Sequence, residues 1–162
     1  FECLALNMCS ICRYNCLALN NGLKWQEDMD TRSTGNIGED LACFYLGGLG
    51  KKVLYRNFRG KIGEIDVIYR DGDGTLVFLE VKAIVAADPR KSVFQPEDHL
   101  TRSKLEKLQR ICALFSAKHP EIINENVGWR IDAIAITMPE IKSQDNLTDI
   151  YKSCVVNYYE NI

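Results

Sequence analysis

The sequence lacks several features on which common functional classes depend. The only two histidines, His99 and His119, give little support to a His-based catalytic triad. Gly35 and Gly38 lie at a predicted helix start, without the third glycine and the preceding strand of a dinucleotide-binding fingerprint. No apolar run is long enough to span a bilayer, and no secretory signal pattern opens the chain. These absences favour a cytoplasmic protein without a membrane partner.

The composition suits a single globular domain. Of the 162 residues, 46% are hydrophobic and 26% are charged, which is enough apolar material for a sizeable core. The formal net charge of −2 at first argues against a nucleic-acid partner. However, residues 51–118 hold 14 Lys and Arg against 9 Asp and Glu. The overall net charge therefore does not exclude a locally basic surface.

The first 28 residues differ from the rest of the chain. They hold four of the seven cysteines, which are Cys3, Cys9, Cys12 and Cys16. The C-x2-C spacing of two of them is typical of half of a zinc site, but a second such pair is missing. We therefore expect residues 1–28 to be a poorly patterned extension rather than a zinc site, and residues 29–162 to form the folded domain.

The hydrophobic periodicity predicts a mixed α/β fold. Helical spacing of apolar residues occurs over 34–46 and from residue 97 or 98 to 118. Strands are expected over residues 52–58, 62–70, 75–83, 128–138 and 150–156, with a hairpin turn at 71–74. Three consecutive strands followed by a crossover helix indicate a mixed β-sheet flanked by helices, in the order αβββαββ.

Four charged side chains interrupt two of these apolar strands. Glu64 and Asp66 share one face of the first strand, and Glu80 and Lys82 share one face of the second, because side chains alternate along a strand. Two carboxylates about 5 Å apart repel by roughly 3 kcal/mol at an effective dielectric constant near 20. A bound divalent cation would offset this repulsion. The alternative is a surface ion pair between Glu80 and Lys82.

An Asp followed by Glu-x-Lys on an adjacent strand suits metal-assisted cleavage of a phosphodiester. Asp66 and Glu80 would hold Mg²⁺, or Mn²⁺ in its place. Lys82 would orient the attacking water or stabilise the developing negative charge. Glu39, near the start of the first predicted helix, is the available third carboxylate and third metal ligand.

These residues lie in blocks that resemble the PD-(D/E)xK nuclease superfamily, and within it the YraN-like uncharacterised family, which is related to archaeal Holliday-junction resolvases. The resemblance covers residues 35 to about 159. Its blocks are G-x-x-G-E-D-x-A at 35–42, R-N-F-R at 56–59, G-E-I-D-V-I at 63–68, V-F-L-E-V-K at 77–82, Lys104, and W-R-I-D-A-I-A-I at 129–136.

The resemblance implies a restriction-endonuclease-like fold with a catalytic site made of Asp66, Glu80, Lys82, Glu39 and Glu64. Glu64 has an open role, either as a partner of Lys82 or as a ligand of a second metal ion. The nucleic-acid-binding residues are expected to be Arg56, Arg59 and Lys104. Arg130 and Asp132 match a later block, where a structural ion pair or strand-end contact is at least as good an explanation as catalysis.

One departure concerns the residues after Lys82. Relatives usually carry a basic residue two positions further on, whereas Ala83 and Ile84 follow here.

The leading hypothesis is a magnesium-dependent endonuclease acting on DNA, including branched or flap DNA, with a homodimer as one form. The alternative is a catalytically silent nucleic-acid-binding accessory protein with the same fold.

Overall fold

The computed structural model describes residues 34–91, 101–142 and 145–162. The predictions on the extension 1–28 and on zinc at Cys3, Cys9, Cys12 and Cys16 lie outside these residues. Within them, three α-helices and a short 3-10 helix accompany a five-stranded sheet. The elements in chain order are α1 (Thr34–Gly48), β1 (Lys52–Gly60), β2 (Gly63–Arg70), β3 (Leu76–Val85), α2 (Arg102–Lys118), η4 (Pro120–Ile122), β4 (Trp129–Met138), α3 (Leu147–Ser153) and β5 (Val155–Tyr159).

The sheet is mixed, with spatial order β1-β2-β3-β4-β5. The first three strands form an antiparallel meander, β3 and β4 are parallel, and β5 returns antiparallel to β4. The parallel pair requires a crossover between β3 and β4, and α2 lies in that connection. The predicted mixed sheet with flanking helices is therefore confirmed.

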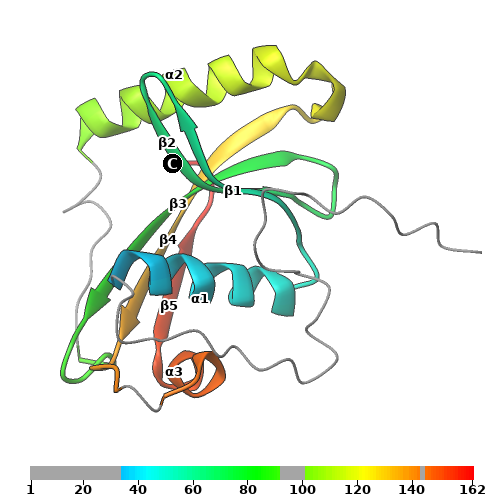
Figure 1. Ribbon diagram of the computed structural model, residues 1–162. Helices are drawn as coiled ribbons and strands as arrows, with labels where there is room; N and C mark the ends of the chain where they lie inside the picture. The colour runs from blue at the N-terminus through cyan, green and yellow to red at the C-terminus, as the bar shows by residue number, and fades with distance from the viewer. Residues whose placement is uncertain (1–33, 92–100, 143–144) are drawn as a thin grey trace, which may run out of the picture.

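Helices cover both faces of the sheet (Figure 1). On one face, α1 and α3 pack on a core that includes Val77, Leu79 and Val81 of β3. On the other face, α2 packs on a core that includes Leu76 and Phe78. Because side chains alternate along β3, the even-numbered Glu80 and Lys82 belong to the α2 face.

Two close approaches fix the helices on the sheet. A Cβ added to Gly38 of α1 would lie 2.3 Å from the Cβ of Ala83 on β3, so this contact needs a small residue on both elements. At the far end of the β1–β2 hairpin, a Cβ on Gly60 would lie 3.1 Å from Ile111 of α2. The hairpin end therefore rests directly on the middle of α2.

The prediction of a strand over residues 150–156 was wrong in its first half. Residues Leu147–Ser153 form α3, and the strand β5 begins at Val155, so the predicted order αβββαββ lacks one helix. Asn146 caps α3, because its side chain accepts a hydrogen bond from the backbone N–H of Asp149 at 3.0 Å. This local cap outweighs the strand preference of Ile150 and Tyr151.

The other predicted boundaries hold with small changes. Helix α2 begins at Arg102 after the N-cap Thr101, and the earlier start expected at residue 97 or 98 falls outside the described residues. The predicted turn at 71–74 joins β2 to β3, with Gly74 at a φ of 93°. Among the described residues, no helix is both long and apolar enough to cross a membrane.

Candidate functional site

The candidate site lies where β2 separates from β3. Their ladder ends at the pair Val67 and Leu79, and continuing this register sets Asp66 opposite Glu80. Beyond this pair, a side-chain hydrogen bond replaces the backbone ones between the two strands. The Oδ2 atom of Asp66 accepts the backbone N–H of Val81 at 2.7 Å. The backbone geometry therefore brings together the two carboxylates that the sequence singled out.

The Glu80 carboxylate is nearly buried and carries two lysine partners. Its side chain is 5% exposed, and its Oε1 lies 2.5 Å from Nζ of Lys82 and 2.6 Å from Nζ of Lys104. Lys82 comes from the same face of β3, whereas Lys104 reaches across from α2. Lys104, expected at a nucleic-acid surface, thus contacts the proposed metal ligand directly, although 42% of its side chain remains exposed.

The electrostatics of the site favour a cation. Burial, and next the neighbouring Glu80 carboxylate, raise the pKa of Asp66 to about 7. Burial alone would lower the pKa of Lys104, but its hydrogen bond with Glu80 outweighs this effect and raises it. Two neighbouring carboxylates with this little solvent require positive charge nearby, and the two ammonium groups supply that charge in this structure.

Glu39 approaches the site from α1. Its Oε2 accepts a hydrogen bond from Nδ2 of Asn57 at 2.7 Å, and Arg56 lies 3.8 Å from the same oxygen. Burial raises the pKa of Glu39, partly offset by these two partners. The Glu39 charge in turn contributes to the raised pKa of Asp66, so the two carboxylates are electrostatic neighbours.

Asn57 is a residue to which the sequence reasoning assigned no role. It stands in the R-N-F-R block, between two arginines that drew attention through their charge. The available signal was its residue type, because Asn is unusual inside a strand and tolerates left-handed backbone. Its backbone is indeed left-handed, with a φ of 51°.

The remaining predicted residues divide into internal and exposed ones. Arg56 has only 12% of its side chain exposed and binds Oδ1 of Asp40 at 2.6 Å, which ties β1 to α1. Arg59 and Glu64 are exposed and lie 3.6 Å apart, farther along the hairpin. Arg59 is thus accessible to a phosphate, whereas Arg56 is committed to the protein.

The donors present suit a magnesium ion held by few protein ligands. No group of three His, Cys, Asp or Glu side chains in metal-binding geometry occurs within residues 34–91, 101–142 and 145–162. Mg²⁺, however, is commonly bound by one or two carboxylates together with waters and substrate phosphates. Asp66 accepts the Val81 N–H through Oδ2, and Glu80 pairs with the two lysines through Oε1. The other carboxylate oxygen of each residue takes no part in these contacts.

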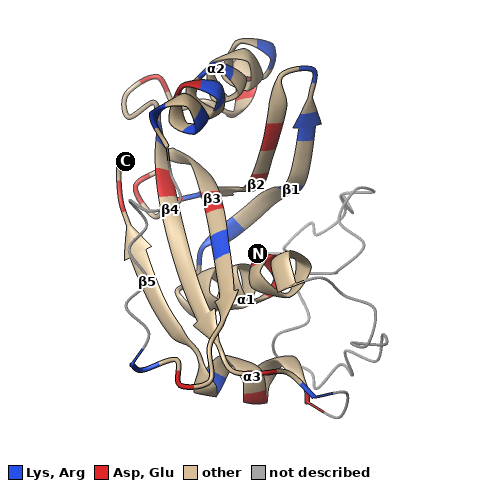
Figure 2. Ribbon diagram, turned by 90° about the vertical axis from the view of Figure 1, so that its left-hand side faces the viewer, with Lys and Arg blue, Asp and Glu red and all other residues tan. Residues whose placement is uncertain are grey.

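Exposed basic residues border this region. Figure 2 shows lysines and arginines along α2 and at the end of the β1–β2 hairpin. They include the exposed Arg59, Lys61, Arg102, Lys107 and Arg110. Because Gly60 rests on Ile111, the hairpin and α2 carry these charges on one continuous part of the molecule. We call these five residues the basic rim.

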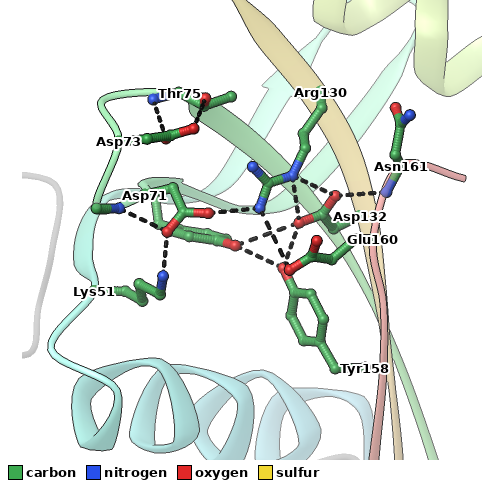
Figure 3. Close-up of polar contacts among 11 residues, drawn as sticks. Lys51, Asp71, Asp73, Thr75, Arg130, Asp132, Tyr158, Glu160 and Asn161 are labelled. Atoms are coloured by element: carbon green, nitrogen blue, oxygen red, sulfur yellow. Dashed lines mark hydrogen bonds and ion pairs between the residues drawn. The ribbon is translucent and has the colours of Figure 1, made fainter. Parts of the chain in front are cut away.

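A second polar cluster lies on the opposite, α1-side face of the sheet (Figure 3). Nε of Arg130 lies 3.0 and 3.1 Å from the two oxygens of Asp132, and its NH2 lies 2.7 Å from Oδ2 of Asp71. Lys51 also pairs with Asp71. The pKa of Asp71 is held below its usual range by its hydrogen bonds with Lys51 and Arg130, against the opposing effect of burial.

Asp132 is the centre of this cluster and is fully buried. Besides Arg130, it accepts hydrogen bonds from the Tyr158 hydroxyl at 2.6 Å and from the backbone N–H of Asn161 at 2.9 Å. These contacts tie β4 to β5 and to Asn161, two residues beyond β5. Of the two explanations for Arg130 and Asp132, the geometry supports the structural ion pair.

Comparison with known proteins finds several proteins of similar sequence. A "UPF0102 protein" of Ralstonia pickettii (strain 12J) is 49% identical over 106 residues, covering 65% of this chain and 82% of that protein. One from Caldicellulosiruptor saccharolyticus is 34% identical over 112 residues, covering 68% and 86%. One from Sulfurihydrogenibium sp. (strain YO3AOP1) is 32% identical over 122 residues, covering 73% and 96%.

The family model for "Uncharacterised protein family UPF0102" matches residues 38–136, which include Glu39, Asp66, Glu80, Lys82 and Lys104. The match begins within α1 and ends within β4, and it contains every residue assigned to the candidate site. This chain therefore belongs to the uncharacterised protein family UPF0102.

Proposed function

We propose that this protein is a divalent-metal-dependent nuclease of the PD-(D/E)xK type, with a restriction-endonuclease-like fold, that hydrolyses phosphodiester bonds in DNA. The observation that carries the proposal is the Asp66 and Glu80 pair on neighbouring strands, with Lys82 on the same face of β3 as Glu80. Mg²⁺ is the proposed cofactor, and Mn²⁺ is its expected substitute.

The charge balance of the cluster supports this proposal. A surface ion pair between Glu80 and Lys82 would account for two of the charges, but Glu80 is nearly buried and a second carboxylate, Asp66, faces it. Burying two neighbouring carboxylates disfavours folding unless positive charge accompanies them. Such a costly arrangement on apolar strands is typical of functional sites.

Each side chain then has a distinct role. Asp66 and Glu80 would hold the cation, which when bound polarises a phosphate oxygen and lowers the pKa of a bound water. Lys82 would orient that water or stabilise negative charge on the phosphate. The basic rim would bind the flanking phosphates, and its charge would make that binding depend on salt.

A specific observation favours the alternative of a nucleic-acid-binding protein that no longer cuts. Two ammonium groups already neutralise Glu80, and Lys104 would have to move away from it for a cation to bind through Oε1. If the lysines hold their places permanently, the cluster would serve only to bind phosphate.

Cleavage assays on a panel of DNA substrates separate the two functions. The panel contains linear duplex, single-stranded, flap and four-way-junction DNA, each incubated with Mg²⁺, Mn²⁺ or a chelator. We expect metal-dependent cleavage by the wild type and its loss in Glu80→Gln and Lys82→Ala. Binding without cleavage on every substrate would contradict the nuclease and favour the accessory protein.

The matched control is Glu106→Gln. Glu106 lies on α2 like Lys104, but it is exposed and pairs with Arg102 at 3.3 Å. This variant removes one carboxylate from the same region without touching the Asp66 and Glu80 pair, so it should cleave like the wild type.

A further inference from the structure

Asn57 has an unusual backbone conformation and lies on β1 at the level of the candidate site. Its φ of 51° is left-handed, although it lies inside β1, where extended backbone is the rule. The register of β1 and β2 pairs Arg56 with Val67 and Phe58 with Ile65. Asn57 therefore stands opposite Asp66, in the same row across the sheet as the candidate site.

The side chain of Asn57 leaves the sheet for α1. Its Nδ2 donates to Oε2 of Glu39 at 2.7 Å, while the preceding Arg56 binds Asp40. Two consecutive residues of β1 thus hold two consecutive carboxylates of α1. The left-handed backbone is unfavourable for most residues, and such conformations concentrate at functional sites where the surroundings enforce them.

The residue type fits the contact. Asparagine tolerates left-handed backbone better than most residues and has an amide that donates to a carboxylate. Glycine would keep the backbone but lose the donor. Aspartate would keep the backbone but set a negative charge against Glu39.

Glu39 gains a fixed position from this contact. A glutamate has three rotatable side-chain bonds, and an exposed one would sample many rotamers. Asn57 engages Oε2 and leaves Oε1 outside that hydrogen bond. The bond therefore restrains the carboxylate without using both of its oxygens.

We propose that Asn57 is a positioning residue that holds the Glu39 carboxylate beside the Asp66 and Glu80 pair, where Glu39 would accept hydrogen bonds from the waters of a divalent cation held by that pair. This inference rests on the proposed function. It assigns a role to the left-handed residue of β1 and explains why a helix on the opposite face of the sheet contributes a carboxylate to the site.

Calorimetric titration of the full chain with Mn²⁺ alone tests this inference without relying on catalysis. Asn57→Gly preserves the backbone geometry and removes the amide, so it should fold normally and bind Mn²⁺ about tenfold more weakly, as is typical when a group that orients a metal-site carboxylate is lost. Glu39→Gln should weaken binding by a similar factor. The double variant should bind no more weakly than Glu39→Gln, because Asn57 acts through Glu39.

A second asparagine supplies the matched control. Asn161 also has left-handed backbone, with a φ of 55°, and its contact with the Asp132 cluster is made by the backbone N–H. Asn161→Gly should therefore bind Mn²⁺ like the wild type. A conservative test is Asn57→Asp, which should bind more weakly than Asn57→Gly if repulsion displaces Glu39.

The outcomes distinguish this inference from the proposed function. If Glu80→Gln abolishes Mn²⁺ binding but Asn57→Gly binds like the wild type, the positioning role is wrong and the metal site stands. Additive losses in the double variant would also overturn the role, because they would show that Asn57 acts independently of Glu39. If Glu80→Gln leaves Mn²⁺ binding unchanged, the proposed metal site itself fails.

Discussion

Replacing Asp66 with asparagine should stabilise the protein at neutral and alkaline pH. The substitution removes a charge that is unfavourable because it is buried and because it repels Glu80, and it keeps an oxygen that can accept the N–H of Val81. Ionised Asp66, which we expect to be essential for activity, should therefore lower the free energy of unfolding. This opposition is typical of sites that are strained for function.

The magnitude follows from the raised pKa of Asp66. A tenfold change in proton affinity corresponds to about 1.4 kcal/mol, so a rise from the ordinary value of 3.8 to about 7 corresponds to roughly 4 kcal/mol. Asp66 is partly exposed, and solvent screening lowers this figure, so we expect about 2–4 kcal/mol.

The direction of the pH dependence follows from proton binding. Between about pH 4 and pH 7 the folded protein keeps a proton on Asp66 that the unfolded chain has released. The contribution of this group to stability is therefore complete below pH 4 and is lost as the pH rises through 7. Asparagine does not titrate, so the advantage of Asp66→Asn should grow from near zero at pH 4 to its full size at pH 8.

Urea unfolding followed by circular dichroism, in the presence of a chelator, measures this difference at each pH from 4 to 8. Asp88→Asn is the control, because Asp88 is an exposed carboxylate paired with Lys91 and should change stability by less than about 0.5 kcal/mol at every pH. A difference in unfolding free energy between wild type and Asp66→Asn that does not vary with pH would show that the Asp66 charge does not destabilise the fold. So would a variant less stable than wild type at pH 8.

Three further predictions concern the fold and the basic rim. Asp132→Ala should reduce the free energy of unfolding by about 3–5 kcal/mol in urea titrations, because it leaves the guanidinium of Arg130 without its main partner; Mn²⁺ binding should not change. Gly38→Ala should cost about 1–3 kcal/mol, because the new Cβ would collide with Ala83, and Ala83→Gly should restore part of this loss. Lys107→Ala should weaken DNA binding and reduce the slope of log affinity against log salt by about 1, as measured by fluorescence anisotropy. An unchanged salt slope would place Lys107 outside the interface.

Local patterns in the sequence were sufficient to predict most of the sheet. The alternation through β2 and β3, and the turn residues Asp71 to Gly74 between them, predict a hairpin without any knowledge of distant contacts. The period-two rule also set Glu80 and Lys82 on one face. Helix α3 was not predicted, because Ile150 and Tyr151 favour a strand. The only local signal for the helix is its N-cap, Asn146, which is a single residue.

The partners of the charged residues could not be predicted in the same way. Arg56 looked like a phosphate-binding residue but pairs with Asp40, 16 positions earlier in the chain. Lys104 looked similar but lies on Glu80, because the crossover brings α2 over that end of β3. Such pairings depend on how helices pack on the sheet, and no local pattern encodes them.

The most direct test of the central claim is a comparison of DNA cleavage by wild type and Glu80→Gln, purified in parallel, with Mg²⁺ as the added cation. The substrate is the one that the wild type cuts fastest in the panel, and rates are measured with enzyme in excess over DNA. We expect cleavage that requires Mg²⁺ and falls by at least about 100-fold in Glu80→Gln. Equal rates in the two proteins, or a rate that persists in chelator, would contradict this expectation.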